Sequence, residues 1–232
     1  MSYLHARAHA DRVGAELQMD PWIGEKIFEV PINRIAPETR NLPRRNEFDL
    51  RPDETNVNIR TYAQSQGAMI YTRKQARDWL ELALAFPPYP RLLGKELNDW
   101  LRPDAIVAHR RVGDYIGYGY PVVSEASIMA AVEKFGLKGE IQMVTEEKPH
   151  ISETVSPELS WFPDFLILLR ARTLLRGNSS FSWLAALLGY GRVFSPVIDG
   201  LEGGKEHDVR FVQGNWPRFA NLPFVTDLHV AE

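Results

Sequence analysis

Two short segments of the chain hold the side chains best suited to bind a charged ligand. In the first, His109 and Arg111 come at the end of the apolar run Asp104–His109. Residues two apart on a strand point the same way, so these two side chains share one side of the strand's end. A guanidinium there can bind a phosphate through two parallel hydrogen bonds. A cluster of surface ion pairs is the alternative.

The second segment joins a predicted strand, which ends at Gly177, to a predicted helix. Ser179 or Ser180 can cap this helix. The free amides of a helix N-terminus attract anions, although the same residues also make an ordinary cap. The two segments put a cation and a helix N-terminus at one edge of one sheet. This pairing indicates a diphosphate site.

Other chemistry has little support. Asp164 stands near the start of a predicted helix, where it either stabilises the helix dipole or recognises a nucleobase. The chain has no Asp-x-Asp, so we expect no metal site. His5 and His9 lie one helical turn apart without an evident acidic third ligand, which favours a satisfied or exposed pair. The motifs GxGxxG, GxxxxGK[ST], GxSxG and HExxH are not met in the context that they require.

Short strands alternate with helices from Asp104 onward, which is typical of right-handed βαβ units and a parallel sheet. Ligands of such sheets lie beyond the carboxyl ends of the strands, near residues 109–120 and 177–180. The expected strands are 104–109, 140–144, 173–177 and 192–196, and the expected helices are 124–136, 162–171 and 180–189.

The first half is less regular, and a proline-rich stretch near residues 86–103 separates it from the second. Residues 31–56 predict a long loop, either functional or a plain surface loop. The expected helices are 2–15 and 72–85, and the expected strands are 15–19, 26–30 and 56–63.

The composition is that of an ordinary globular protein, with 44% hydrophobic and 25% charged residues. A net charge of -3 gives no reason to expect a nucleic acid as partner. Without cysteine, disulfides and thiolate metal sites are excluded. No signal peptide pattern is present, and no apolar run approaches the roughly 18 residues of a membrane span. We therefore expect a cytoplasmic protein without a transmembrane segment.

Two motifs give the chain a resemblance to the α-1,2-fucosyltransferase family and its GT-B fucosyltransferase relatives. The family's His-x-Arg-Arg-Gly-Asp-Tyr stands here as residues 109–115, with Val112 in place of the second arginine. Its serine-rich motif stands here as NSSFSWLAA, from Asn178 onward. Weaker likeness is found in Asp164-Phe165-Leu166, Val193-Phe194-Ser195-Pro196, TYAQSQGAMIY and ARAHADRVGAELQMD.

The resemblance implies an α/β, GT-B-like fold of two Rossmann-like halves with a parallel sheet in each. Residues 1–95 are the expected acceptor-side half, and residues 104–232 the expected half that binds the nucleotide-sugar donor. The family has a strand and a Gly-Gly-Leu-Gly-Asn-Gln turn before its first helix. Because the residues here start within that helix, the resemblance implies an incomplete N-terminal half.

The activity that the resemblance implies is an inverting, metal-independent transfer of fucose from GDP-fucose to a hydroxyl of a glycan acceptor, without a cofactor. Arg111 and the amides of Ser179 and Ser180 would stabilise the leaving diphosphate. Asp114 would be a general base or would fix Arg111. The remaining donor-binding residues are His109 and Asp164, which would hold the guanosine, with Asn178 and Phe181.

Two alternatives to this activity stay open. One is a noncatalytic remnant that binds a nucleotide or a glycan. The other is a glycosyltransferase that uses another nucleotide sugar. Donor hydrolysis in the presence of candidate acceptors separates an enzyme from a binding module.

Overall fold

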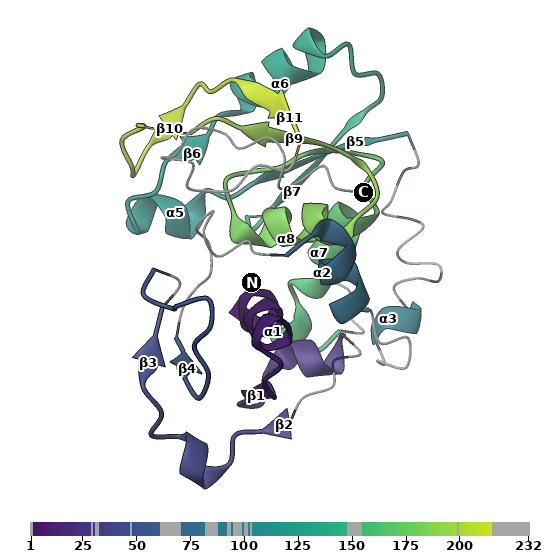
Figure 1. The fold of residues 1–232 in the computed structure, drawn as a ribbon. Coiled ribbons are helices and arrows are strands. Elements are labelled where there is room, and N and C mark those ends of the chain that lie inside the picture. The colour runs from purple at the N-terminus through teal and green to yellow at the C-terminus, as the bar shows by residue number, and fades with distance from the viewer. Residues whose placement is uncertain are drawn as a thin grey trace. The chain divides into compact units, whose positions relative to one another are not determined.

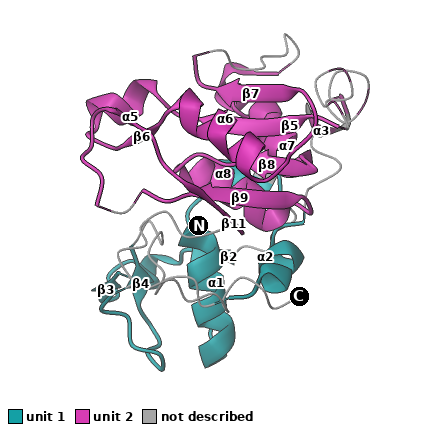
Figure 2. Ribbon diagram, turned by 90° about the horizontal axis from the view of Figure 1, so that it is seen from above, with its two compact units in different colours: residues 1–86, 224–232 teal, residues 87–223 magenta. Residues whose placement is uncertain are grey.

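The computed structural model describes residues 2–28, 30, 33–46, 48–60, 71–81, 88–91, 94, 99, 102, 104–147, 155–198 and 200–214. The chain divides into two compact units, residues 1–86 with 224–232 and residues 87–223 (Figure 2). The predicted division into residues 1–95 and 104–232 remains a prediction.

The second unit is built on a five-stranded sheet with the order β11-β9-β8-β5-β7 (Figure 2). In this sheet, β5, β7, β8 and β9 run parallel to one another, and β11 runs antiparallel to β9. This confirms the prediction of a mixed α/β chain with parallel strands. The bounds are β5 (Ile106–Arg110), β7 (Ile141–Thr145), β8 (Thr173–Leu175), β9 (Arg192–Pro196) and β11 (Phe211–Gln213).

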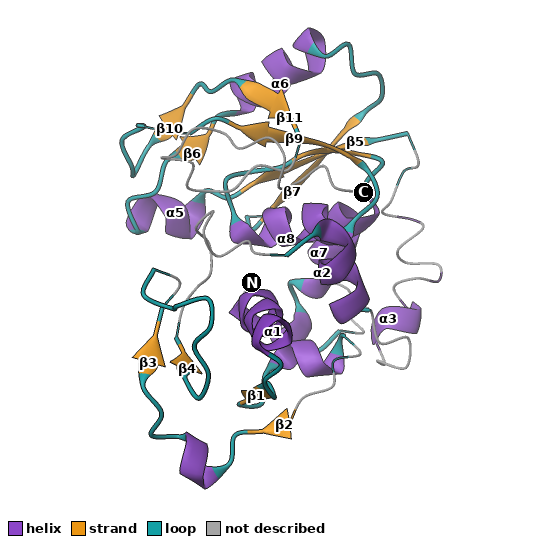
Figure 3. Cartoon of the chain, in the orientation of Figure 1, coloured by secondary structure: helices purple, strands orange, loops and turns teal. Residues whose placement is uncertain are grey.

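The helices of this unit, purple in Figure 3, begin where local capping signals stand in the sequence. Ser124 and Ser179 each accept a backbone N–H through the side-chain oxygen, and Pro163 stands in the first turn of α7. The helices are α3 (Pro88–Arg91), α5 (Gly113–Gly117), α6 (Glu125–Lys134), α7 (Phe162–Arg170) and α8 (Ser180–Leu188), with the 3-10 helix η5 (Pro157–Leu159).

The core of the second unit forms because helices cover both faces of the sheet. Figure 1 shows α6 on one face, and α7 and α8 on the other. Every residue of β5 is buried, as expected for a central parallel strand. The α6 side chains Ile128 and Ala131 pack in one cluster with Ile106 and Ala108 of β5. A separate short parallel pair, β6 (Val122–Val123) with β10 (Glu206–His207), adjoins this framework.

The first unit holds shorter elements. Among its described residues, the strands form two separate two-stranded parallel pairs, β1 with β2 and β3 with β4. The strand expected at 26–30 is wrong for the described residues: a 3-10 helix runs to Lys26, Ile27 lies in a turn, and Phe28 forms only a single bridge. The bounds are α1 (Ser2–Val13), β1 (Gln18–Met19), η1 (Ile23–Lys26), β2 (Asn33–Arg34), η2 (Pro37–Thr39), β3 (Arg44–Arg45), β4 (Asn58–Ile59) and α2 (Arg73–Trp79).

The loop expected at 31–56 therefore contains β2, η2 and β3. A residue outside the loop holds its first part: the Gln18 side-chain oxygen accepts the Ala36 N–H at 3.1 Å and the Thr39 hydroxyl at 3.0 Å. Residues 61–63 and 82–85, at the ends of a predicted strand and a predicted helix, lie outside the described residues.

Candidate functional site

The candidate site lies at the carboxyl edge of the five-stranded sheet. Arg110 ends β5 directly opposite Thr145, which ends β7. Arg111 and Glu146 are therefore the first residues beyond two neighbouring parallel strands. On the other side of β5, Leu175 of β8 pairs with Ala108, so the start of α8 follows from the same edge.

His109 is buried where β5 meets the start of α8. Its side chain is 5% exposed, and its ring lies 5.9 Å from the ring of Phe181, between centroids. Among the described residues, its Nδ1 atom has no hydrogen-bond partner. Gly177 backs this ring so closely that a β-carbon there would meet it. The structure thus brings together His109 and Phe181, two of the predicted donor-binding residues.

Burial, together with the smaller effect of the nearby positive charges of Arg111 and Arg176, lowers the pKa of His109 to about 3. The imidazole is neutral at neutral pH for this reason. A neutral ring has one N–H donor and one nitrogen lone pair, so it can hydrogen-bond a ligand without adding charge.

Arg111 is paired with Asp114 on the first turn of α5. It donates to both carboxylate oxygens, from Nε at 2.8 Å and from Nη2 at 2.5 Å. The hydrogen bond from Arg111 lowers the pKa of Asp114 and raises the pKa of Arg111. This is the contact that a positioning role for Asp114 requires, and a carboxylate with a lowered pKa is a weak proton acceptor. Its role as general base stays a prediction.

The guanidinium of Arg111 also lies 5.2 Å from the centre of the Tyr115 ring. About a third of each side chain of this ion pair is exposed, 36% for Arg111 and 37% for Asp114. An exposed ion pair of this kind contributes little to folding, roughly 0–1 kcal/mol. Its main consequence is to orient a solvent-accessible guanidinium at the sheet edge.

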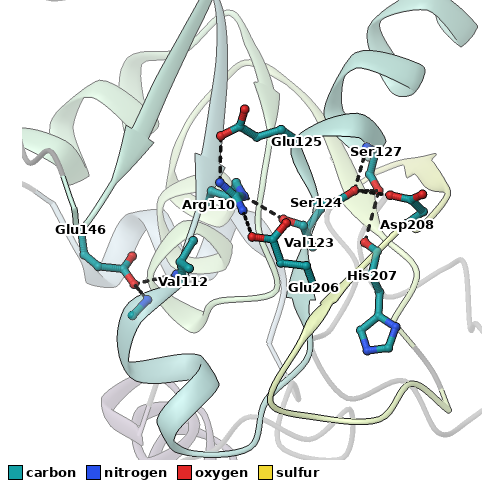
Figure 4. Close-up of polar contacts among 11 residues, drawn as sticks. Arg110, Val112, Val123, Ser124, Glu125, Ser127, Glu146, Glu206, His207 and Asp208 are labelled. Atoms are coloured by element: carbon teal, nitrogen blue, oxygen red, sulfur yellow. Dashed lines mark hydrogen bonds and ion pairs between the residues drawn. The ribbon is translucent and has the colours of Figure 1, made fainter.

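Arg110, by contrast, is an internal brace (Figure 4). Its Nε donates to the Val123 carbonyl at 2.9 Å and its Nη1 to Glu125 at 2.9 Å. A third hydrogen bond and ion pair joins it to Glu206. The motif His-x-Arg-Arg-Gly-Asp-Tyr leaves the position of Arg110 unspecified. In the structure, Arg110 links β5 to β6 and β10.

Two of the predicted residues before α8 make internal contacts. The Asn178 amide donates to the Pro121 carbonyl at 2.7 Å, and the Ser179 side chain accepts the Phe181 N–H at 3.2 Å. Both side chains are buried. Ser180 and Phe181 are partly exposed, so these two are the accessible ones among the predicted donor-binding residues 178–181.

Asp164 is buried in the first turn of α7. Aromatic side chains connect this turn to α8: the Phe165 ring lies 5.5 Å from the Phe181 ring, and the Trp161 ring lies 6.1 Å from it. Phe181 in turn contacts His109. The start of α7, the start of α8 and the end of β5 thus share one aromatic cluster, made of Trp161, Phe165, Phe181 and His109.

Sequence reasoning missed Arg176, the buried residue between the end of β8 and Gly177. Its side chain is 1% exposed, and it donates to the Ser195 hydroxyl at 2.8 Å and to the Gly177 carbonyl at 2.9 Å. The Ser195 hydroxyl donates onward to the Gly214 carbonyl at 2.6 Å. An arginine inside the apolar strand Thr-Leu-Leu-Arg-Gly was the signal, because a buried cation needs several acceptors.

Glu146 was missed as well. One of its carboxylate oxygens, Oε1, accepts the backbone N–H groups of Val112 and Gly113, each at 2.6 Å (Figure 4). The carboxylate therefore caps the first turn of α5, next to Arg111. An acidic residue that directly follows a strand was the available signal.

His5 and His9 of α1 are both buried. The ring of His9 lies between two partners: Nδ1 accepts from the Arg12 guanidinium at 2.8 Å, and Nε2 donates to the Glu54 carbonyl at 2.7 Å. A guanidinium only donates and a carbonyl only accepts, so both ring nitrogens of His9 have a matching partner. Within the described residues, no group of three His, Cys, Asp or Glu side chains is placed to hold a metal ion.

The helices of the described part of the chain are too short or too polar to cross a membrane. Comparison of the chain with models of protein families, with curated proteins and with solved structures gives no match.

Proposed function

We propose that this chain is an inverting, metal-independent glycosyltransferase that moves fucose from GDP-fucose to a hydroxyl of a glycan acceptor. The observation that carries the proposal is the set of groups at one sheet edge: the oriented guanidinium of Arg111, the neutral His109 and the start of α8. Parallel sheets bind nucleotides at this edge, where strand ends and helix N-termini meet.

Sugar transfer requires a group on the enzyme that binds the diphosphate more tightly as the bond between the diphosphate and the sugar breaks. Negative charge builds on the leaving oxygen, and a held guanidinium gains most when that charge is complete. Arg111 presents two N–H groups in one plane, now directed at Asp114. The same pair of donors suits two phosphate oxygens.

The base of the donor is proposed to lie near the start of α7. The carboxylate of Asp164 can accept two parallel hydrogen bonds from the guanine edge. The partly exposed ring of Phe181 lies 5.5 Å from the ring of Phe165, the next residue in the same turn, and offers an aromatic surface to the base. On this proposal, residues 104–232 form the donor half of a GT-B-like protein. The first unit would contribute the acceptor side.

A noncatalytic nucleotide-binding module is the second candidate. It is favoured by the pairing of Arg111 with Asp114, because the hydrogen bond from Arg111 lowers the pKa of Asp114 and makes this carboxylate a weak general base. Such a module would bind GDP and GDP-fucose but would not transfer the fucose.

The test is a donor screen followed by turnover. Calorimetry with GDP-fucose, GDP-mannose, UDP-glucose and a dTDP-sugar is expected to give binding only for the guanine nucleotides. Release of GDP from GDP-fucose with a panel of glycan acceptors is then expected to survive excess EDTA. Binding of GDP-fucose without turnover on any acceptor supports the second candidate. If no guanine nucleotide binds, both candidate functions are wrong.

A further inference from the structure

Glu146 makes an unusual contact for an exposed side chain. One of its two carboxylate oxygens, Oε1, accepts two consecutive backbone N–H groups, those of Val112 and Gly113, each at 2.6 Å. We infer that Glu146 is a positioning residue for Arg111. Glu146 acts on the arginine through the two backbone amides that follow it, those of Val112 and Gly113. The inference rests on the proposed donor site at Arg111.

The first turn of α5 explains why this contact matters. The first N–H groups of a helix have no partner within the helix, so they need an acceptor from elsewhere. Val112 precedes α5 and Gly113 begins it, and Glu146 supplies the acceptor for both from the end of β7. The contact therefore joins the ends of two neighbouring strands across the site.

Arg111 lies between two anchored neighbours. On one side, Arg110 is held by the Val123 carbonyl, Glu125 and Glu206. On the other side, Val112 is held by Glu146. The backbone of Arg111 has little freedom between these anchors, and Asp114, on the turn that Glu146 caps, then orients its guanidinium. Figure 4 shows the two anchors on either side of this short segment.

Gly113 fits the same arrangement. A β-carbon on Gly113 would lie 3.5 Å from Glu146 Oε1, which is ordinary contact distance. The carboxylate is thus packed against this residue as well as hydrogen-bonded to it. Its negative charge also belongs to the surroundings of Arg111 and raises the pKa of that arginine, after the larger contribution of Asp114.

Three substitutions separate positioning from other effects of the carboxylate. Glu146→Ala removes the acceptor, whereas Glu146→Gln keeps an acceptor oxygen and removes the charge. Glu147→Ala is the matched control: Glu147 is the next residue and is also exposed, and its own N–H is bonded to the Thr145 side chain. Glu147→Ala therefore removes one carboxylate from the same turn without touching the two amides.

The first readout is amide hydrogen exchange, which needs no ligand. In Glu146→Ala the N–H groups of Val112 and Gly113 are expected to exchange about tenfold faster or more, while Glu146→Gln and Glu147→Ala stay within about threefold of the wild type. Unchanged exchange in Glu146→Ala overturns the inference.

The second readout is the affinity for GDP by calorimetry. Glu146→Ala is expected to bind GDP about tenfold more weakly, and Glu146→Gln at least as tightly as the wild type. Equal weakening in both variants would mean that the charge of Glu146, and not its place as an acceptor, supports the site, and this too overturns the inference.

The two proposals can fail separately. If wild-type protein binds no GDP while Glu146→Ala alone loses amide protection, the donor site is wrong and the bracing of the Arg111 turn stands. If wild-type protein binds GDP and Glu146→Ala binds it equally well with intact protection, the donor site stands and the positioning role is wrong.

Discussion

Gly177 and His109 approach each other so closely that only a glycine fits between β8 and α8. A β-carbon on Gly177 would lie 2.9 Å from the His109 carbonyl oxygen and 3.0 Å from His109 Nδ1. The first of these contacts is with the backbone of the central strand, which cannot move aside cheaply. The strand-to-helix turn that leads to Ser179 therefore depends on this glycine.

Gly177→Ala is expected to lower the free energy of unfolding by about 1–3 kcal/mol, the usual cost of overpacking. Gly117→Ala is the control, because a β-carbon there meets no atom within 4 Å. That variant should be unchanged or more stable by up to about 1 kcal/mol. Urea denaturation measures both. A Gly177→Ala protein as stable as the wild type would show that β8 and β5 lie farther apart.

His109 gives the stability of the fold a pH dependence between pH 6.5 and 3. Its pKa in the folded protein is about 3, below its ordinary value of 6.5. As the pH falls, the unfolded chain therefore takes up the proton first. The contribution of neutral His109 is complete above pH 6.5 and is lost toward pH 3, at up to about 1.4 kcal/mol per pH unit.

The measurement is urea denaturation of the wild type and of His109→Asn at pH 7 and pH 5. The wild type is expected to lose about 2 kcal/mol more than the variant over this range. An NMR titration should find the His109 ring still neutral at pH 5 in the folded protein. A ring that titrates near pH 6 would place this side chain in contact with water.

Neighbouring arginines are expected to differ in what they contribute. Arg111→Ala should leave the free energy of unfolding within about 1 kcal/mol of the wild type, because its ion pair is exposed. Transfer from GDP-fucose should fall about 10²–10³-fold or more, by analogy with lost oxyanion donors worth about 3–4 kcal/mol. Near-normal turnover by folded Arg111→Ala would remove this arginine from the mechanism.

Arg110→Ala is the counterpart. It should cost about 1–3 kcal/mol of stability, since the buried Val123 carbonyl loses its donor and the guanidinium its packing. Equal stability of the two alanine variants, by thermal or urea unfolding, would contradict the different roles assigned to them.

Asp164 is expected to make the donor site prefer guanine. Its carboxylate can accept from guanine N1–H and N2–H together, a pair worth on the order of 1–3 kcal/mol in base readout. Uracil offers one donor on that edge, and adenine presents an acceptor at N1. Asp164→Ala should therefore weaken GDP binding about tenfold while weak UDP binding barely moves. Calorimetry with both nucleotides decides between this role and a purely structural one at the start of α7, which leaves both affinities unchanged.

Much of the second unit follows from local signals in the sequence. The predicted strands and helices are confirmed in type, with bounds that shift by a few residues, because caps such as Ser124 and Ser179 act on backbone groups two or three residues away. Alternation along a strand likewise indicates that His109 and Arg110 point to opposite sides. These features depend on side chains and backbone within one turn or one strand.

The partners of those side chains were decided by the tertiary structure alone. Arg110 became the buried brace because Glu206, 96 residues farther along, lies on a strand beside β6. Glu146 caps α5 because β5 and β7 are neighbours in register. Strand order and register join residues that no short window contains. The sequence could therefore indicate which residues stand at the sheet edge, whereas only the folded chain determines which of them are anchored and which stay accessible to a ligand.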